Sequence, residues 1–585
     1  MKPTLAILML CSATLLVLAA GLAGCQDNQG AFTLTPASRP SAYLIQPGIA
    51  GTVSEYARLN GGDEVALRGY GVVVGLGENG SGEVPPNLEK YLGQLMLKYQ
   101  MVAPSQAGSA LTPARLLRDK DTAIVIVLGK IPPAAPAGTR FDLRVEVLPG
   151  GQATSLDGGT LMSCDLQMAL TTAANDLTGA KSWGVGRGEL FLNPFAEADK
   201  PSDDDAARMR MGTIPGGGVV IKSRPIYLEL HQPDYRISSL IAKRVNQRLS
   251  AAGESNVATA ISPSMVRIDL PKSQREDYIH FLGLVMHVNI TGGEGLDERL
   301  AKQLVQAIAL PTARYDDIAL TWEAMGRQIL PFLRPLYTSE NTSVSFYASR
   351  TGLRLQDEMA IGPMLLIAGQ GNSPNQIPAI EALGQAKWTI QPVSLLRGLL
   401  SDRNNLTRVA AYEALVQHGP SAAIESVKIS RDFSFDIVDS HSNYTVYCTR
   451  TGKSRIVLFG RDIPIARPVF YCPKDDLVTV CANDKQDKLL IQRKLPRNGR
   501  ISDPMYIAPN VTELVRKLGS IPEPDENNQI PGLGLSYSQV VGVLYQLSQG
   551  KYISADFVLQ RAPEIQRIYL SGSATGRPNM PEEEQ

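Results

Sequence analysis

Histidine is scarce in this sequence, and the few histidines are dispersed. His231, His280, His287, His418 and His441 include no two at the HxH, HxxH or HxxxH spacing. Transition-metal sites usually draw on clustered histidine or cysteine side chains, so we expect no metal site. The sequence also lacks the HExxH and GxSxG motifs and a pair of carboxylates beside a nucleophile. We therefore expect neither an enzyme nor a bound cofactor.

An excess of charge is also missing. Lys plus Arg number 57, as do Asp plus Glu, so the formal net charge is zero. No overall field therefore draws the protein to nucleic acid, and we expect no nucleic-acid partner. With 44% hydrophobic residues, the chain is expected to fold. Its 585 residues are too many for one core, so several domains are predicted.

The N-terminus has the pattern of an export signal. Residues 1–24 combine a basic residue, Lys2, with an apolar run and small residues before Cys25. This end resembles a bacterial lipobox, which implies lipidation of Cys25; a plain transmembrane anchor is the alternative. Because Gln26 is not Asp, we expect delivery to the outer membrane. Residues 25–47 are polar and rich in Pro and Ser, which predicts a tether.

A glycine-rich stretch at 67–83 stands out in the N-terminal part. Gly75, Gly77 and Gly80 fit GxGxxG directly after a run of valines, but two prolines follow where a dinucleotide site needs a helix, and the acidic residues Glu78 and Glu83 make a poor anion cradle. We therefore predict a β-hairpin with a glycine-rich tip instead. The glycines expected to serve strand packing or a turn are Gly69, Gly71, Gly75, Gly77, Gly158 and Gly159.

The region from residue 48 to 293 has mixed periodicity. Residues 124–128 form a continuous apolar run, typical of a strand buried on both faces, and 141–147 alternate as in a half-exposed strand. Residues 237–249 place apolar side chains at helical spacing, and 266–270 alternate again. This block is predicted to be α+β.

From residue 296 to 420 the periodicity is helical. Segments 325–333 and 344–355 are separated by a polar turn, and related pairs recur at 361–383 and 395–415. Three such pairs resemble HEAT repeats, which bury a face by stacking. An unrelated helical bundle is the alternative. We expect this block to be an interaction module or a spacer.

The last part of the chain is β-rich and then helical. Residues 421–510 contain several short alternating segments, and 511–570 contain two amphipathic helical segments, 511–518 and 537–547. Residues 571–585 end in a run of glutamates and are predicted to be a disordered tail.

Four cysteines are left once Cys11 leaves with the signal and Cys25 is lipidated. Of these, Cys448, Cys472 and Cys481 fall in the β-rich unit, whereas Cys164 lies far from them. In an oxidising compartment we expect a disulfide between Cys472 and Cys481, or between Cys448 and either of them.

The order of these motifs resembles the flagellar P-ring protein family. The stretch from Leu67 to Gly82 is similar to the family's GYGLVVGL signature with its glycine-rich tip. The segment from Pro132 and Pro133 through the strand at Phe141 to the turn at 155–161 resembles the next characteristic stretch. Residues 230–235 with the following helix, then 258–260 and 266–268, resemble a third. The helical segments of 511–570 look like the paired helices that close the family's fold.

This resemblance implies an α+β multidomain fold. It consists of a β-rich, P-ring-like frame with an inserted all-α, HEAT-like solenoid. The implied function is a non-enzymatic ring subunit: many copies would surround the flagellar rod in the periplasm and support motility. The implied partners are other copies of the chain, the rod and L-ring proteins, peptidoglycan, and a membrane through the N-terminal lipid. The alternative is an outer-membrane lipoprotein scaffold that keeps the P-ring fold and binds an envelope protein through its helical repeats.

Overall fold

The computed structural model describes most of the chain between residues 50 and 560. The described ranges are 50–61, 64–100, 112–132, 134–168, 181–192, 209–250, 256–275, 277–291, 294–371, 373–429, 433–449, 453–472, 478–494, 500–520 and 532–560. The predicted signal, tether and C-terminal tail, with Cys25, lie outside these ranges.

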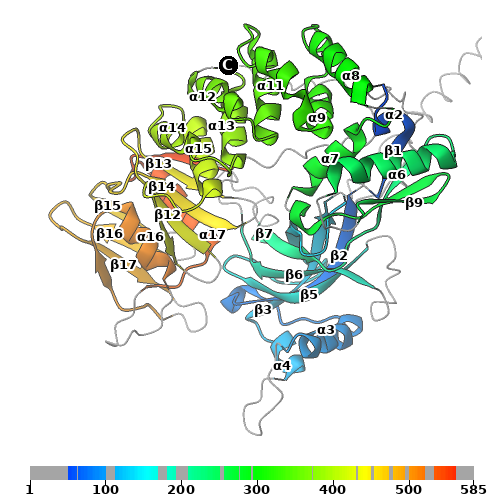
Figure 1. Ribbon diagram of the computed structural model, residues 1–585. Coiled ribbons are helices and arrows are strands. Elements are labelled where there is room, and N and C mark those ends of the chain that lie inside the picture. Colours follow the sequence, from blue (N-terminus) through cyan, green and yellow to red (C-terminus); the bar gives the residue numbers. More distant parts are fainter. Residues whose placement is uncertain are drawn as a thin grey trace, which may run out of the picture. The chain divides into compact units, whose positions relative to one another are not determined.

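A closed β-barrel occupies the first part of the fold (Figure 1). Its strands run in the order β2-β3-β4-β7-β6-β5, and each neighbouring pair is antiparallel. The strands are β2 (Val65–Val74), β3 (Thr122–Ile131), β4 (Arg140–Val147), β5 (Thr160–Met168), β6 (Ser182–Glu189) and β7 (Met211–Val220). The first six residues of β3 are buried and β4 alternates between exposed and buried, as the sequence predicts for both strands.

The glycine-rich stretch does not form the predicted hairpin. β2 pairs with β3 and with β5, and the helices α3 (Pro86–Lys98) and α4 (Pro113–Leu117) lie between β2 and β3 in the chain. A short 3-10 helix, η1 (Gly77–Asn79), leads toward α3. Pro86 stands in the first turn of α3. A proline there interrupts no helical hydrogen bond, so the two prolines start a helix instead of excluding one.

A small antiparallel sheet with flanking helices completes the N-terminal region. Its strand order is β1-β8-β10-β9, formed by β1 (Ala57–Asn60), β8 (Ile226–Leu230), β10 (Met265–Ile268) and β9 (Ala258–Ser262). Helix α6 (Tyr235–Leu249) packs on β9 and β10. Its N-cap, Asp234, accepts a hydrogen bond from the backbone N–H of Arg236 at 2.7 Å. The remaining elements are α2 (Val53–Tyr56), η2 (Lys272–Gln274) and α7 (Tyr278–His287).

The middle block is helical throughout its described length (Figure 1). Helix α12 packs on α13 and α14 packs on α15, in the two pairs predicted at 361–383 and 395–415. The helices are α8 (Glu294–Ala307), α9 (Tyr315–Met325), α10 (Leu330–Leu333), α11 (Thr342–Arg354), α12 (Ile361–Gly369), α13 (Gln376–Gln385), α14 (Pro392–Leu399) and α15 (Asn405–His418), with the 3-10 turns η3 (Arg327–Ile329), η4 (Arg334–Leu336) and η5 (Glu358–Ala360).

The first predicted pair differs in its first member. Instead of one helix at 325–333, Gly326 takes a φ of +82° and ends α9, and short turns follow it. The helix that packs on α11 is therefore α9, which the sequence did not reveal. The assignment of these pairs to HEAT repeats stays a prediction.

Two sheets and two helices form the C-terminal part. The first sheet has the order β11-β12-β14-β13-β19 and the second has the order β15-β16-β17-β18. The strands are β11 (Ile424–Lys428), β12 (Phe433–Val438), β13 (Thr445–Cys448), β14 (Ser454–Phe459), β15 (Val469–Tyr471), β16 (Val478–Ala482), β17 (Leu489–Arg493), β18 (Met505–Ile507) and β19 (Asp556–Leu559), and the helices are α16 (Val511–Gly519) and α17 (Tyr537–Gln549).

The expected division at residue 510 is not present in the structure. Strand β19 runs parallel to β13 and so joins the sheet of the preceding β-rich unit. Side chains of α16 and α17, such as Leu514 and Val540, share one hydrophobic core with Phe435 and Ile456. The described residues between 421 and 559 therefore form one folding unit, because neither the sheet nor the helices could bury their apolar faces alone.

Candidate functional site

The predicted structural glycines lie on the glycine-rich strand β2 and on the turns at its end. At Gly69, an added Cβ would lie 2.3 Å from the carbonyl oxygen of Asp165 on β5. At Gly71, it would lie 2.8 Å from Leu161 Cδ1 and 3.3 Å from Val127 Cγ2. The pairing of β2 with β5 is irregular between Arg68 and Val73, so the two backbones approach closely at this seam.

The seam is clamped from outside by the end of α3. Asp165 is 8% exposed, and its carboxylate accepts hydrogen bonds from Lys98 Nζ and the Tyr99 hydroxyl, each at 2.6 Å. Burial and this carboxylate raise the pKa of Tyr99, so its hydroxyl stays protonated and remains a donor. The close approach at Gly69 is thus held in place by a partly buried polar cluster.

Several amide groups of the turn after β2 already have partners inside the protein. Gly75 and Gly77 take φ values of +87° and +62°. The Gly77 N–H donates to Asp121 Oδ1 at 2.7 Å, and the Ser81 N–H donates to the carbonyl of Thr122 at 2.9 Å. These donors already have partners inside the protein. The turn is therefore hydrogen-bonded to the residues at the start of β3 and does not form an anion cradle.

Gly158 and Gly159 form a second turn, which approaches both β2 and helix α17. A Cβ at Gly159 would lie 2.5 Å from Val73 Cγ1, and one at Gly158 would lie 2.4 Å from Gln539 Nε2. Gln539 belongs to the capping box of α17. These two predicted residues therefore lie where the barrel meets the C-terminal unit.

The end of β6 adds hydrogen bonds to the same junction. The Leu192 N–H donates to Ser538 Oγ at 3.1 Å, and the Ser538 hydroxyl donates to the Leu192 carbonyl at 3.2 Å. The Phe191 ring lies 5.8 Å from the Tyr537 ring, between centroids. Ser538 is buried, so this paired hydrogen bond is shielded from water.

Sequence reasoning missed a second set of glycines, which surround one aromatic ring inside the barrel. A Cβ at Gly218 would lie 2.4 Å from the Phe141 ring, and one at Gly129 would lie 2.7 Å from it. At Gly186, a Cβ would lie 2.7 Å from Leu143 Cδ1. A six-stranded barrel has a narrow interior, so glycines make room for Phe141 and Leu143. The sequence pattern that could have revealed this set is the glycine at every second residue of Trp183-Gly-Val-Gly-Arg-Gly.

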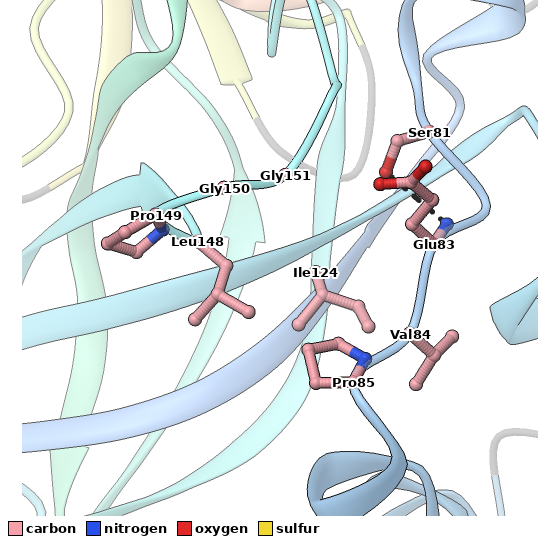
Figure 2. Close-up of a pocket in the computed structure, with 9 residues that line it drawn as sticks. All are labelled: Ser81, Glu83, Val84, Pro85, Ile124, Leu148, Pro149, Gly150 and Gly151. Atoms are coloured by element: carbon pink, nitrogen blue, oxygen red, sulfur yellow. Dashed lines mark hydrogen bonds between the residues drawn. The ribbon is translucent and has the colours of Figure 1, made fainter.

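A shallow pocket of about 430 Å³ adjoins the glycine turn (Figure 2). Ile124 and Leu148 contribute apolar surface, and Ser81 and Glu83 supply the polar side chains. The other lining residues are Val84, Pro85, Pro149, Gly150 and Gly151. One exposed carboxylate beside a hydroxyl and apolar side chains can hold a side chain of a partner, but it lacks the acid–base pair that hydrolysis requires.

Two histidine–carboxylate pairs join the N-terminal region to the helical block. His280 Nε2 lies 2.7 Å from Glu323 Oε1, and His287 Nε2 lies 3.4 Å from Asp317 Oδ1. Both histidines are on α7 and both carboxylates are on α9. His287 and Asp317 are each 3% exposed, so the contact between these helices contains a buried polar pair.

A buried polar network joins the other end of the helical block to the C-terminal sheet. The Tyr412 hydroxyl on α15 donates to Asp436 Oδ2 on β12 and accepts from Arg455 Nη1 on β14 at 2.9 Å. The Tyr447 hydroxyl donates to Glu413 Oε1 at 2.6 Å. Burial, together with the nearby carboxylates, raises the pKa of both tyrosines, so both remain donors. The helical block is thus fixed at both ends.

The expected disulfide between Cys472 and Cys481 is not formed. The register pairs Cys481 with Phe470, and Cys472 follows β15 with its Sγ 3.8 Å from Thr479 Oγ1. The two cysteines are therefore diagonal neighbours, whose spacing of about 7–8 Å exceeds what a disulfide spans. Cys448 is buried on the other sheet. Burial raises the pKa of the Cys164 thiol to about 12, which keeps it protonated.

The described residues show no metal centre or membrane span. No three His, Cys, Asp or Glu side chains come together as a metal site in the part of the chain that the structure describes. Within the same ranges, no helix is both long and apolar enough to cross a bilayer.

Known proteins resemble the N-terminal region most clearly. Residues 52–296 match the family model described as flagellar P-ring protein. A flagellar P-ring protein of Geobacter sulfurreducens is 25% identical over 352 residues, which cover 58% of this chain and 88% of that protein. One from Nitratidesulfovibrio vulgaris is 29% identical over 255 residues, covering 42% of this chain and 64% of the relative.

A third flagellar P-ring protein, from Anaeromyxobacter dehalogenans, is 30% identical over 242 residues, covering 40% of this chain and 58% of the relative. The chain thus spans less than two thirds of the second and third relatives. The matched residues 52–296 include the whole barrel and the β1-β8-β10-β9 sheet. Through this region, the chain is similar to the flagellar P-ring proteins.

Proposed function

We propose that this chain is a structural, non-catalytic subunit of a flagellar P-ring-like assembly that surrounds the rod in the periplasm and supports motility. The observation that supports this most directly is the family match over residues 52–296, the region that forms the barrel. A ring built from one kind of chain closes through head-to-tail contacts, so several copies are expected to assemble. The glycine-lined, tightly filled barrel suits a mechanical part better than a binding cavity.

The helical block is proposed to act as a rigid spacer within this subunit. It is fixed to the N-terminal region through α7 and α9 and to the C-terminal sheet through α15. Buried pairs such as His287 with Asp317 and Tyr412 with Asp436 resist bending at both joints. A spacer between two parts of one subunit needs this double attachment.

The location and partners rest on the sequence together with the family. A lipid on Cys25 would hold the N-terminus at the outer membrane, and residues 25–47 would span the gap to the first strand. The proposed neighbours are the rod and L-ring proteins and peptidoglycan.

Deletion of the gene tests the function. We expect cells that do not swim, and basal bodies that lack a periplasmic ring when imaged. Motility should return when the intact gene is supplied in trans. Normally motile deletion cells with complete rings would overturn the proposal.

The alternative, a lipoprotein scaffold that uses its helical repeats to bind an envelope protein, predicts a different outcome of the same experiment. In that case the deletion strain keeps its rings and motility but loses a partner in pull-downs with the intact protein. Removing the helical block is a poor test, because Asp436 and Arg455 would then lose Tyr412 from their buried network.

A further inference from the structure

The barrel gathers basic side chains at one of its two ends. Neighbouring strands are antiparallel, so the starts of β2, β4 and β6 lie at the same end as the ends of β3, β5 and β7. All of these strands except β5 place one exposed cation at or near this end. We call these cations the basic rim: Arg68, Lys130, Arg140, Lys181 and Lys222.

Carboxylates neutralise little of the basic rim. Lys130 Nζ lies 3.1 Å from Glu64 Oε2. Among the residues that the structure describes, the other members of the rim form no ion pair. Arg140 donates to the Gly216 carbonyl at 3.2 Å, and the neighbouring Asp142 accepts from the Gly216 N–H at 2.6 Å. The rim therefore keeps an excess of positive charge.

The opposite end of the barrel carries both signs of charge. There, Glu146 and Glu189 lie near the ends of β4 and β6, and Lys120 and Arg210 precede β3 and β7. Charge is thus unevenly distributed on a chain whose formal net charge is zero. A local excess of one sign attracts a partner of the opposite sign.

Apolar surface lies between two of the cations. The Ile221 N–H donates to the Trp183 carbonyl at 3.0 Å, so the residues before Lys222 adjoin those after Lys181. Lys181 Nζ lies 5.5 Å from the centre of the Trp183 ring, and Ile221 is 42% exposed. Tryptophan and lysine side chains together are typical of the headgroup level of a bilayer, because each has an apolar body and a polar end.

The spacing of the basic rim fits a surface better than a single small anion. Strands about 4.8 Å apart, six of them closed into a barrel, form a circle roughly 10 Å across, and one phosphate cannot reach cations on all its sides. A flat layer of anionic groups can. An acidic protein would offer the same charge, but it would gain less from the exposed Ile221 between the cations.

We propose that the basic rim is a membrane contact, in which Lys and Arg side chains donate to the phosphate oxygens of anionic phospholipid headgroups. This inference rests on the proposed location at a membrane, but not on assembly of a ring. A flexible tether as long as residues 25–47 would keep the barrel within about 26 Å of a lipid on Cys25. The rim would then add a second, salt-sensitive attachment to that of the lipid.

Binding to vesicles tests the contact. The chain from residue 25 onward carries Cys25→Ala, so that no lipid is attached, and is sedimented with vesicles of phosphatidylcholine alone or mixed with phosphatidylglycerol. We expect it to bind the mixed vesicles far better than the neutral ones, and to be released by added salt. Lys181→Gln combined with Lys222→Gln should weaken this binding about 25-fold, because each lysine at an anionic surface contributes about fivefold.

The matched control is Lys120→Gln combined with Lys387→Gln. Both lysines are exposed; Lys120 lies at the opposite end of the barrel, and Lys387 lies in the helical block. This variant loses the same charge and should bind the mixed vesicles as the unchanged chain does. Equal weakening in both variants would make net charge responsible and would overturn the assignment to the rim. Thermal unfolding of each variant checks the fold.

Three other results would also overturn the membrane contact. They are equal binding to neutral and mixed vesicles, undiminished binding of the Lys181→Gln and Lys222→Gln variant, and binding of poly-glutamate without binding of any vesicle, which would point to an acidic protein instead. Absence of vesicle binding, together with deletion cells that do not swim, would refute this contact while leaving the proposed function standing.

Discussion

Replacing Gly69 by alanine would push a methyl group into the backbone of the neighbouring strand. The new Cβ would lie 2.3 Å from the Asp165 carbonyl oxygen and 3.0 Å from Leu166 Cδ2, whereas ordinary contacts begin at 3.4 Å. Strand β5 must therefore retreat by about 1 Å. It is not free to do so, because Lys98 and Tyr99 hold the Asp165 carboxylate.

The magnitude follows from the kind of clash. Overpacking a core costs about 1–3 kcal/mol, and a clash with backbone belongs at the upper end because no side-chain rotation relieves it. We therefore expect the free energy of unfolding of the barrel to fall by about 3 kcal/mol. This corresponds to roughly a hundredfold change in the opening equilibrium.

The matched control is Gly93→Ala. Gly93 lies inside α3, where a Cβ would meet nothing within 4 Å. Alanine in a helix interior is favoured over glycine by about 0.5–1 kcal/mol, so this variant should be slightly stabilised. The two variants make the same chemical change with opposite expected signs.

Hydrogen–deuterium exchange of the full chain, resolved by peptide, measures both effects. Peptides from β3 and β5 should exchange roughly a hundredfold faster in Gly69→Ala and no faster in Gly93→Ala. Peptides from α13, in the separate core of the helical block, serve as the internal reference. Unchanged protection of β5 in Gly69→Ala would refute the close-approach argument.

Three further predictions concern other parts of the chain. Tyr412→Phe removes the hydroxyl that donates to buried Asp436, so hydrogen exchange should show α15 and β12 less protected by about 1–3 kcal/mol; equal protection would contradict this. Burial raises the pKa of the Asp357 carboxyl, but its hydrogen bonds, led by the one from Arg334, lower that pKa overall. The ionised Asp357 therefore stabilises the fold fully above its pKa in the unfolded chain, about 4, and this stabilisation is lost as the pH falls through its pKa in the folded chain. Thermal unfolding of Asp357→Asn should accordingly lose less stability on acidification than the unchanged chain does, and an equal loss would count against this role. Cys25→Ala should move the protein out of the membrane fraction; unchanged attachment would disprove lipidation.

Local patterns in the sequence were sufficient for many elements. The apolar run in β3 and the alternation in β4 predicted their burial, because the side-chain period of a strand is two. The same holds for α6, α16 and α17, whose apolar positions follow the helical period. The α+β class and the P-ring resemblance also followed from the sequence, and the structure and the relatives confirm both.

Long-range pairing decided the rest. The glycine stretch was predicted as a hairpin because nothing in the local sequence shows which strands pair with Val65–Val74. Its partners are β3, which follows only after α3 and α4, and β5, which lies still further along the chain. For the same reason, the union of β19 with the sheet of β13 could not be predicted.

The sequence by itself determined that this chain is a neutral, glycine-rich α+β protein, because charge, composition and periodicity can be read from the residues alone. The order of its motifs also showed that the first region resembles a P-ring protein. Only the tertiary structure decided that glycines of β3, β6 and β7 surround Phe141 in one barrel, and that Cys472 and Cys481 lie diagonally. It also decided that Leu366 and Phe470 are exposed, because burial depends on which segments pack together, and that packing joins residues hundreds of positions apart.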